Sequence, residues 1–246
     1  MDLLDDDALE RSPVVANCRM NRERRLPGYN RELGIDVVDT LRARRRVGEP
    51  VRWLDLCCGT GYALGQVADL LGGEGGEDSE GGEDSEGGED SEGGGGGEAE
   101  IVGVDLVDFF ARTSCPPRLR LITASVTTWR PERPFDLITC VHGLHYIGDK
   151  LGLLARVGTW LADDGLFIAN FDVRAIRLED GAPAGRRLTA SLRSQGVRYD
   201  GRTRRIGWTG RRLIDLPYRY RGSDDQAGPN YTGQPAVNSY YEYYEY

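Results

Sequence analysis

The segment from Val51 to Tyr62 constrains the fold of this chain more than any other. A short apolar run ends in the acid Asp55, and the glycines Gly59 and Gly61 follow within a turn. An amphipathic stretch, residues 62 to 71, begins directly after them. A strand, a glycine turn and a helix in this order are typical of the nucleotide-binding edge of an α/β sheet, where glycine lets the backbone approach a ligand closely.

The same turn differs from a dinucleotide-binding fingerprint. Three glycines spaced G-x-G-x-x-G would contact a pyrophosphate, but Leu64 stands where the third glycine is required. A carboxylate at the strand end, as in Asp55, would also repel a phosphate. A ligand with a cationic ammonium and sulfonium fits an acidic strand end better. An NAD(P)-dependent oxidoreductase and a non-catalytic cofactor-binding scaffold remain as alternative functions.

The run D-L-C-C-G-T-G, residues 55 to 61, resembles the first motif of the class I S-adenosylmethionine-dependent methyltransferases, usually written acid-x-G-x-G-x-G. Cys57 replaces the first glycine of that motif and is a departure from it. The resemblance implies a Rossmann-like fold with S-adenosyl-L-methionine as the cofactor. It assigns Asp55, Cys57, Gly59, Thr60 and Gly61 to the cofactor site.

A second acid, Asp105, ends the next β-like run and can accept hydrogen bonds from both ribose hydroxyls; Leu106 follows it. Such an acid is expected about 20 residues after the first motif, whereas Asp105 lies 50 positions after Asp55. Removing the 28 residues from 73 to 100 leaves 22. We therefore interpret 73–100 as an insertion between the first helix and the second strand.

The insertion dominates the charge of the chain. It contains three copies of Gly-Gly-Glu-Asp-Ser-Glu at 75–92 and carries 12 of the 40 acids but none of the 31 bases. The remaining chain has 28 acids against 31 bases, so the net charge of −9 becomes +3 without the insertion. Since the hexads contain no apolar residue to bury, we expect a disordered acidic loop.

Strands and helices alternate after the insertion, as a doubly wound sheet requires. This pattern predicts an α/β fold with a Rossmann-like, doubly wound, seven-stranded sheet, mostly parallel with one antiparallel strand near the C-terminus. We expect strands at 118–124, 135–141 and 165–171, helices at 151–161 and 188–195, and a closing hairpin from 204–208 and 212–220.

The resemblance also assigns residues at the later strand ends. Ser125 and Val126 follow the third strand, where the family contacts adenine, often through an acid. Cys140 ends the fourth strand, whose F-D-L-I run resembles a family element. The D/N-P-P-Y signature of amino-methylating DNA enzymes is absent here, which favours a small-molecule acceptor and argues against nucleic acid.

His142 and His145 are the only histidines, and both lie beside the fourth strand. An imidazole titrates near neutrality and can remove a proton from an attacking atom. We therefore consider His142 as the catalytic base and as a substrate contact. The alternative for His145 is a packing residue in the turn. Neither histidine has an acid or cysteine cluster around it, so no metal site is predicted.

Residues 1–50 are expected to form an N-terminal helical cap. A turn at 27–30 precedes an amphipathic helix at 31–46, and Tyr29 is a candidate substrate contact; a basic helix packed on the sheet is the alternative. The C-terminal tail, 227–246, is turn-rich and then tyrosine-rich. It is expected either to fold over the pocket with Tyr231 as a wall or to be disordered at its end.

We thus expect a single methyltransferase domain over residues 1–246. It would move a methyl group by direct in-line displacement to an O, N or C nucleophile. No signal peptide, no apolar run of about 18 residues and no C-x-x-C pair among the five cysteines are visible. These features predict a cytoplasmic protein with no membrane contact, acting as a monomer or a homodimer.

Overall fold

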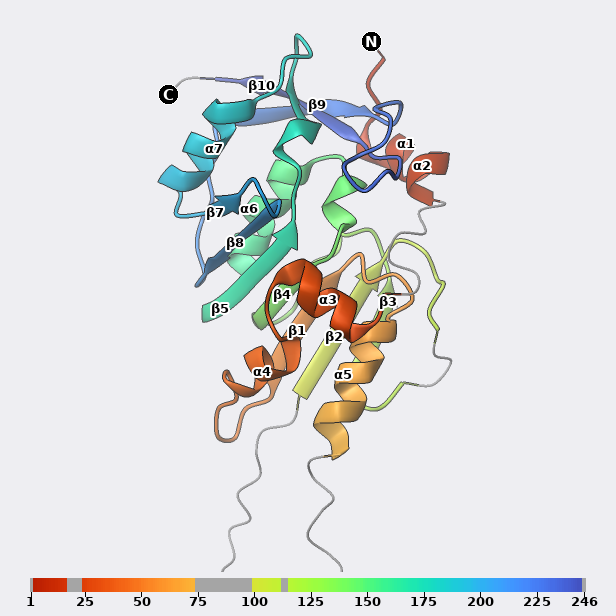
Figure 1. Cartoon of the computed structure of the whole chain (residues 1–246), viewed down its shortest axis with the longest axis vertical. Helices are drawn as coiled ribbons and strands as arrows, with labels where there is room; N and C mark the ends of the chain where they lie inside the picture. Colours follow the sequence, from red (N-terminus) through yellow and green to blue (C-terminus); the bar gives the residue numbers. More distant parts are fainter. Residues whose placement is uncertain (1, 17–23, 74–98, 112–114, 245–246) are drawn as a thin grey trace, which may run out of the picture.

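A seven-stranded sheet forms the centre of the computed structural model, which describes residues 2–16, 24–73, 99–111 and 115–244. The strand order is β3-β2-β1-β4-β5-β8-β7 (Figure 1). Neighbouring strands are parallel from β3 to β5, whereas β8 runs antiparallel to both β5 and β7. The strands are β1 (Val51–Leu56), β2 (Ala99–Asp105), β3 (Leu119–Thr123), β4 (Phe135–Cys140), β5 (Leu161–Asn170), β7 (Arg198–Asp200) and β8 (Arg205–Thr209). The predicted doubly wound sheet, with one antiparallel strand near the C-terminus, is confirmed.

The central strands are buried on both faces. All six residues of β4 are buried, and in β1 only Arg52 is partly exposed. Side chains of successive β1 residues enter opposite layers of the core, with Trp53 in one layer and Leu54 in the other. Near-continuous apolar runs of this kind are typical of parallel strands covered by helices on both sides.

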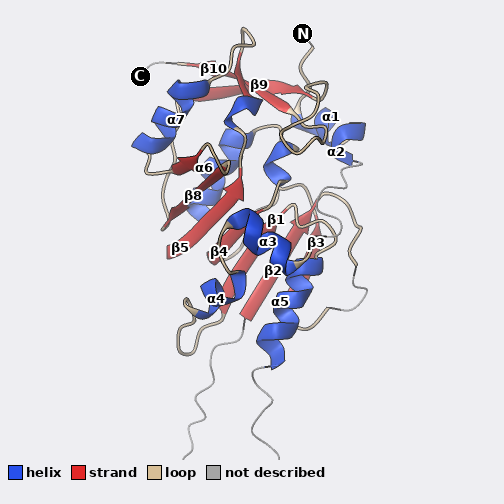
Figure 2. Cartoon of the chain, viewed as in Figure 1, coloured by secondary structure: helices blue, strands red, loops and turns tan. Residues whose placement is uncertain are grey.

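Helices cover the two faces of the sheet (Figure 2). The core layer of one face contains α3 (Leu26–Leu33), α4 (Val37–Arg42) and α5 (Tyr62–Gly72), and that of the other contains α6 (Lys150–Trp160) and α7 (Gly185–Ser194). The predictions of a turn at 27–30 and one helix at 31–46 are wrong. Pro27 is tolerated in the first turn of α3, and Gly34, in a left-handed conformation with φ of 70°, ends that helix before α4 begins.

A second sheet contains the tyrosine-rich tail. Its order is β6 (Ile176–Leu178), β10 (Asn238–Tyr243) and β9 (Tyr218–Asp224). The predicted closing hairpin is therefore wrong, because β8 pairs with β7 and β9 pairs with β10. Tyr241 is 1% exposed, and its hydroxyl accepts a hydrogen bond from the Leu151 N–H and donates one to Asp149. Tyrosines suit such a half-buried strand.

The N-terminal segment packs against this second sheet. The short helix α1 (Asp6–Glu10) lies beside β9, α2 (Pro13–Ala16) contacts α1, and Leu4 forms a β-bridge with Ser223 (Figure 1). The predicted N-terminal cap therefore has two parts, because α3 and α4 cover the main sheet instead. Almost all of the predicted insertion, residues 74–98, lies outside the described residues.

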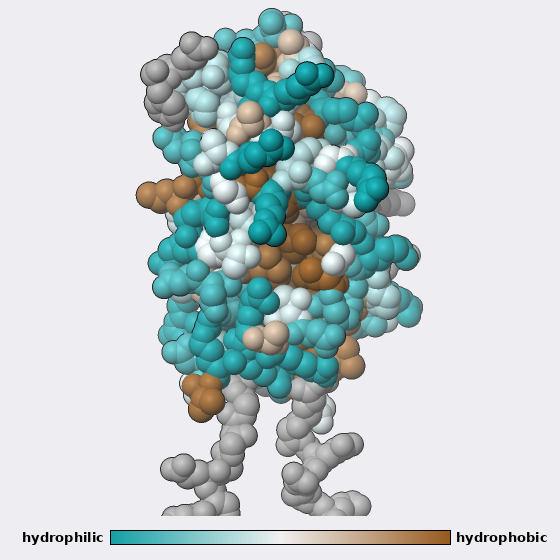
Figure 3. Space-filling view, turned by 60° about the vertical axis from the view of Figure 1, so that its left-hand side comes forward, coloured by the Kyte–Doolittle hydropathy of each residue, from teal (hydrophilic) through white to brown (hydrophobic). Residues whose placement is uncertain are grey.

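The surface on the side of β5, β7 and β8 is mostly hydrophilic, with a hydrophobic region near its centre (Figure 3). A hollow on these strands is lined by apolar residues, including Leu166, Ile168 and Trp208, and by arginines such as Arg198 and Arg205. In the part of the chain that the structure describes, no helix combines the length and the apolar character that crossing a membrane requires.

Gly103 of β2 has no space for a side chain. An added Cβ would lie 2.7 Å from Leu64 Cδ2 and 2.8 Å from both Cys58 Sγ and Leu121 Cδ2. We expect Gly103→Ala to lower the free energy of unfolding by about 1–3 kcal/mol, the usual cost of overpacking a core. Chemical denaturation measures this difference. Gly73→Ala is the matched control, since nothing lies within 4 Å of its Cβ position; an equally small change in both variants would contradict the packing described for β2.

Candidate functional site

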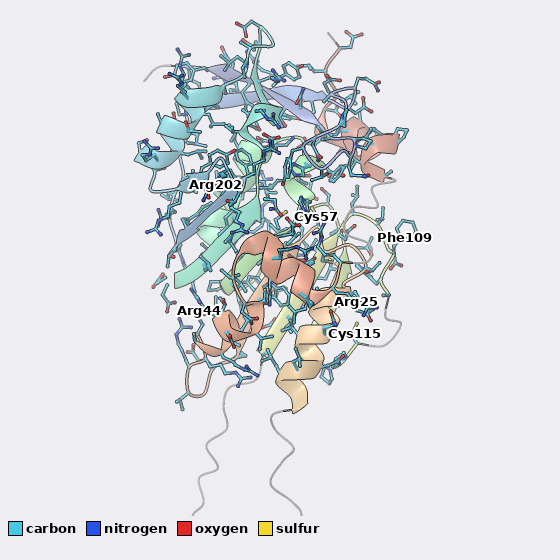
Figure 4. The ribbon with its side chains drawn as sticks, viewed as in Figure 1. Arg25, Arg44, Cys57, Phe109, Cys115 and Arg202 are labelled. Atoms are coloured by element: carbon cyan, nitrogen blue, oxygen red, sulfur yellow. The ribbon has the colours of Figure 1, made fainter. Side chains whose placement is uncertain are left out.

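A cavity that opens to solvent lies at the carboxyl ends of the central strands; its empty space, counted with the open solvent at its mouth, is about 770 Å³. Along the strand order, its lining includes Gly143 after β4, Cys57 and Gly59 after β1, Asp105 at the end of β2, and Ser125 after β3. Figure 4 shows Cys57 near the middle of the molecule, where β1 ends. Ligands collect at this edge of open α/β sheets.

Asp105 joins the glycine turn to the end of β2. Its Oδ2 accepts a hydrogen bond from the Gly59 N–H at 2.8 Å, and its Oδ1 accepts one from the Val107 N–H at 3.2 Å. Asp105 is partly exposed and lines the cavity. An ionised carboxylate accepts hydrogen bonds and donates none, so this side chain presents an acceptor to hydroxyl groups of a ligand. Leu106 lines the cavity beside it.

Cys57 has a backbone conformation that favours glycine, the residue that it replaces in the motif. Its φ of 57° lies in the left-handed region, where a glycine would be unstrained. Its thiol shares a hydrogen bond with Cys140, and this bond, together with burial, raises the pKa of Cys57. Cys140 is buried below the cavity rather than in its lining. A Cβ on Gly143 would lie 2.4 Å from Cys57 Cβ, so this glycine makes room for the cysteine pair.

Asp55 does not line the cavity, because its side chain is fully buried. It accepts hydrogen bonds from the Tyr29 hydroxyl at 2.9 Å and from the Thr139 hydroxyl. Burial raises the pKa of Asp55 to about 7, and these two hydrogen bonds oppose the rise. Asp55 thus connects β1 to α3 and β4. Tyr29, the candidate substrate contact, is 1% exposed and points its hydroxyl at this acid.

Thr60 and Gly61 fix the conformation of the glycine turn without lining the cavity. The Thr60 carbonyl accepts a hydrogen bond from the Ala111 N–H at 2.9 Å. Gly61, with φ of 67°, is the N-cap of α5, and a Cβ there would lie 2.8 Å from a methyl group of Leu121. Neither residue is part of the cavity lining, whereas Ser125 and Val126 both are.

His142 lies in a second cluster, beside the cavity. It precedes the short helix η2 (Gly143–His145), and its N–H donates to Asn170 at the end of β5. Its Nε2 lies 3.3 Å from a carboxylate oxygen of Glu32 on α3, and its Nδ1 lies 3.5 Å from the Tyr231 hydroxyl. Tyr231 comes from the loop between β9 and β10, so three distant segments meet at this imidazole.

Burial keeps both histidines neutral. It lowers the pKa of His142 to about 4, helped by the positive charge of Arg24 and opposed by Glu32. It lowers the pKa of His145 to about 3. His142 is only 2% exposed, so a reacting molecule reaches the imidazole only if a neighbour such as Tyr231 moves. A neutral imidazole can accept a proton.

Backbone strain concentrates around these two clusters. Among the described residues other than glycine, a positive φ occurs only at Cys57, His142 and Arg204. Cys57 lines the cavity, His142 contacts Tyr231, and the Arg204 guanidinium lies 3.9 Å from the centre of the Tyr231 ring. Strained residues of this kind gather at functional sites.

Sequence reasoning missed the residues that close the cavity from outside. Asp6, Leu9, Glu10 and Val15 of α1 and α2 line it. The available signal was the N-cap of α1, where Asp5 accepts a hydrogen bond from the Ala8 N–H at 2.8 Å. That signal indicates a helix but gives no position relative to the sheet.

Lys150, the only lysine of the chain, was also missed. Its ammonium is buried and donates hydrogen bonds to the Ile147 and Val237 carbonyls and to the Ser239 hydroxyl, at 2.7 to 2.9 Å. Burial lowers the pKa of Lys150 to about 7. These bonds fix the end of the Tyr231 loop against the turn after η2. Within the described residues, no group of three or more His, Cys, Asp or Glu side chains is arranged to hold a metal ion.

The methyltransferase domain family has a model that matches residues 22–199 of this chain. No curated protein sequence matches it. Among solved structures, the chain is similar to the plantazolicin methyltransferase BpumL in complex with a pentazolic desmethylPZN analog and SAH. The two are 14% identical, the match covers 63% of this chain and 51% of that one, and the TM-score is 0.41.

Two further structures have comparable similarity. CalS10, an amino pentose methyltransferase from Micromonospora echinaspora in its SAM-bound form, is 21% identical, with 58% of this chain and 50% of that chain covered and a TM-score of 0.38. Coclaurine N-methyltransferase, bound to N-methylheliamine and SAH, is 16% identical, with 56% and 35% covered and a TM-score of 0.36. This chain thus spans between 35% and 51% of the length of the three proteins.

Proposed function

This chain belongs to the methyltransferase domain family, and from that premise we propose that it transfers a methyl group from S-adenosylmethionine to a small-molecule acceptor. Membership supports the methyltransferase activity that the D-L-C-C-G-T-G run predicts, and the run itself supports S-adenosylmethionine as the methyl donor. The observation that carries the proposal is the cavity in which the Asp105 carboxylate and the Gly59 turn meet.

The residues of the cavity fit this cofactor. The Asp105 carboxylate would accept the two ribose hydroxyls, and the tight turn at Gly59 would let the backbone approach the amino-acid end. Gly143, which has no room for a side chain beside Cys57, and the neutral Cys57 thiol form an uncharged part of the cavity wall. Ser125 and Val126 would hold the adenine end. The fully buried Asp55 lies outside the cavity lining and contributes to the fold through its hydrogen bonds with Tyr29 of α3 and Thr139 of β4.

The chemistry that the cofactor supplies is an electrophilic methyl group on a sulfonium. The protein's residues then have to hold an acceptor in line with that group and exclude water, and these two effects supply much of the acceleration. His142 would accept the proton of an acceptor that loses one. Glu32, at 3.3 Å from the imidazole, would orient it and stabilise its charged form. Tyr231 would cover the bound acceptor as a wall of this half of the site.

Two alternative functions can be distinguished from methyl transfer. An NAD(P)-dependent oxidoreductase would need the missing third glycine, for which Leu64 stands in α5. A non-catalytic scaffold would keep the cavity and transfer no methyl group.

The direct test of the proposed function is release of S-adenosylhomocysteine when the protein is incubated with S-adenosylmethionine and a panel of phenols, alcohols, carboxylic acids and amines. We expect release with members of one class only. Binding without release for any class of acceptor would favour the scaffold.

Replacing His142 separates chemistry from binding. With the acceptor that the panel identifies, we expect His142→Gln to lower kcat by about 100-fold, the lower end of the range for general bases. The affinity for S-adenosylhomocysteine, measured by calorimetry, should change by less than about threefold, because the imidazole is outside the cofactor cavity. His145→Gln is the matched control, with its ring centre 5.6 Å from that of His142. Equal losses of kcat in both variants would remove His142 from the mechanism.

A further inference from the structure

The far end of the cavity is built from two segments that are distant in the sequence. Ser125 and Thr127, after β3, line it together with Glu10 of α1. The Ser125 hydroxyl donates to Glu10 Oε1, although the two residues are 115 positions apart, and the Thr127 hydroxyl lies 3.4 Å from the same oxygen. The Ser125 and Thr127 hydroxyl oxygens are 2.6 Å apart. An acid and two hydroxyl groups therefore form one polar cluster at this end.

Glu10 has acceptor capacity left after these contacts. Both hydroxyls approach Oε1, and within the described part of the chain Oε2 accepts no hydrogen bond. The side chain is half-buried at the cavity wall. A carboxylate only accepts hydrogen bonds, and its bonds to N–H donors are among the stronger ones in proteins. The cluster thus favours a ligand that offers an N–H group at this end.

The strand order places this cluster beyond Asp105. Asp105 ends β2, and Ser125 follows β3, the edge strand next to it. Leu106 follows Asp105, Val126 follows Ser125, and both line the cavity, so a nucleoside held at Asp105 by its ribose would meet apolar side chains where its base extends toward β3. The exocyclic amino group is the only N–H donor of the adenine ring system.

We propose that Glu10 accepts a hydrogen bond from this amino group, so that the N-terminal helix α1 supplies the residue that selects adenine. This inference rests on the proposed function, because it needs an adenosyl cofactor in the cavity. In the resembled family an acid after the third strand often contacts adenine. This chain has Ser125 at that place, and Glu10 of α1 would supply the acid instead. Ser125 and Thr127 are positioning residues that hold the carboxylate against the cavity.

The test compares two ligands by titration calorimetry. One is S-adenosylhomocysteine, and the other is its purine analogue in which hydrogen replaces the 6-amino group. We expect the wild-type protein to bind the amino compound at least about tenfold more tightly, as expected for a hydrogen bond to a charged acceptor. Glu10→Ala should reduce this preference to about twofold or less. Glu10→Gln, which keeps a carbonyl acceptor, should retain an intermediate preference.

Asp7→Ala is the matched control, because Asp7 is an exposed acid on the same helix. It should keep the full wild-type preference. If Glu10 only fastens α1 to Ser125, Glu10→Ala weakens both ligands by the same factor and the preference persists; that result overturns the inference. If the wild-type protein binds neither ligand, the proposed function itself fails. A wild-type protein that binds both equally overturns the inference and leaves the proposed function standing.

Discussion

Replacing Asp105 with alanine is expected to weaken the binding of S-adenosylhomocysteine by about 5- to 150-fold, which corresponds to about 1–3 kcal/mol. The carboxylate lines the cavity and, in the proposed function, accepts the two ribose hydroxyls. It also accepts the Gly59 N–H at 2.8 Å, so its loss releases the turn that the amino-acid end of the cofactor would contact. Titration calorimetry measures the change in Kd.

Two controls accompany this variant. Asp108→Ala removes the same charge from an exposed position three residues further on and should leave the Kd within about twofold. Asp55→Asn should also change it little, because Asp55 is fully buried and outside the cavity lining. An unchanged Kd for Asp105→Ala would show that the ribose lies elsewhere, and a large loss for Asp55→Asn would return this acid to the cofactor site.

Replacing Asp55 with asparagine is expected to stabilise the protein at pH 8 but not at pH 4. Burial raises the pKa of Asp55 to about 7, from an ordinary value near 3.8. The folded state therefore holds this proton over a pH range in which the unfolded chain has released it. The contribution to stability is fully present below about pH 4 and is lost as the pH rises through about 7. At about 1.4 kcal/mol per pKa unit, the loss reaches about 4 kcal/mol.

Asparagine has nearly the same shape and no charge to bury, so it removes this loss. Measured by urea denaturation, the unfolding free energy of Asp55→Asn minus that of the wild type should grow by up to about 4 kcal/mol between pH 4 and pH 8. The pH 4 comparison is the internal control, since it reports the exchange of hydrogen bonds with Tyr29 and Thr139 alone. A difference that is constant with pH would mean that Asp55 is ionised in the folded protein at acid pH.

The sheet was predictable because its signals are local. Apolar runs such as 135–141 and the glycine turn after Leu56 specify strands and connections directly, and β4 occupies Phe135–Cys140. The failures come from tertiary contacts. β10 lies in the tyrosine-rich tail: tyrosine favours strands, but the local sequence does not say which strand the tail pairs with. The break at Gly34 between α3 and α4 was hidden by continuous apolar periodicity.

The residues of the site divide in the same way into those that local sequence signals locate and those that tertiary contacts position. Gly59 and Asp105 lie at strand ends, where the order of the chain gives their position. Glu10 and Glu32 come from the helices α1 and α3, and no local pattern says where such helices pack. Asp55 illustrates a third case: its place at the end of β1 was predicted, but its burial under Tyr29 depends on how α3 docks.

The most direct test of the central claim is calorimetric titration of the purified protein with S-adenosylhomocysteine, and separately with NAD⁺ and NADP⁺. A single saturable site for S-adenosylhomocysteine and no heat of binding for either dinucleotide is the result that the cavity at Asp105 predicts. Saturable binding of NAD⁺ or NADP⁺, with none of S-adenosylhomocysteine, would contradict it.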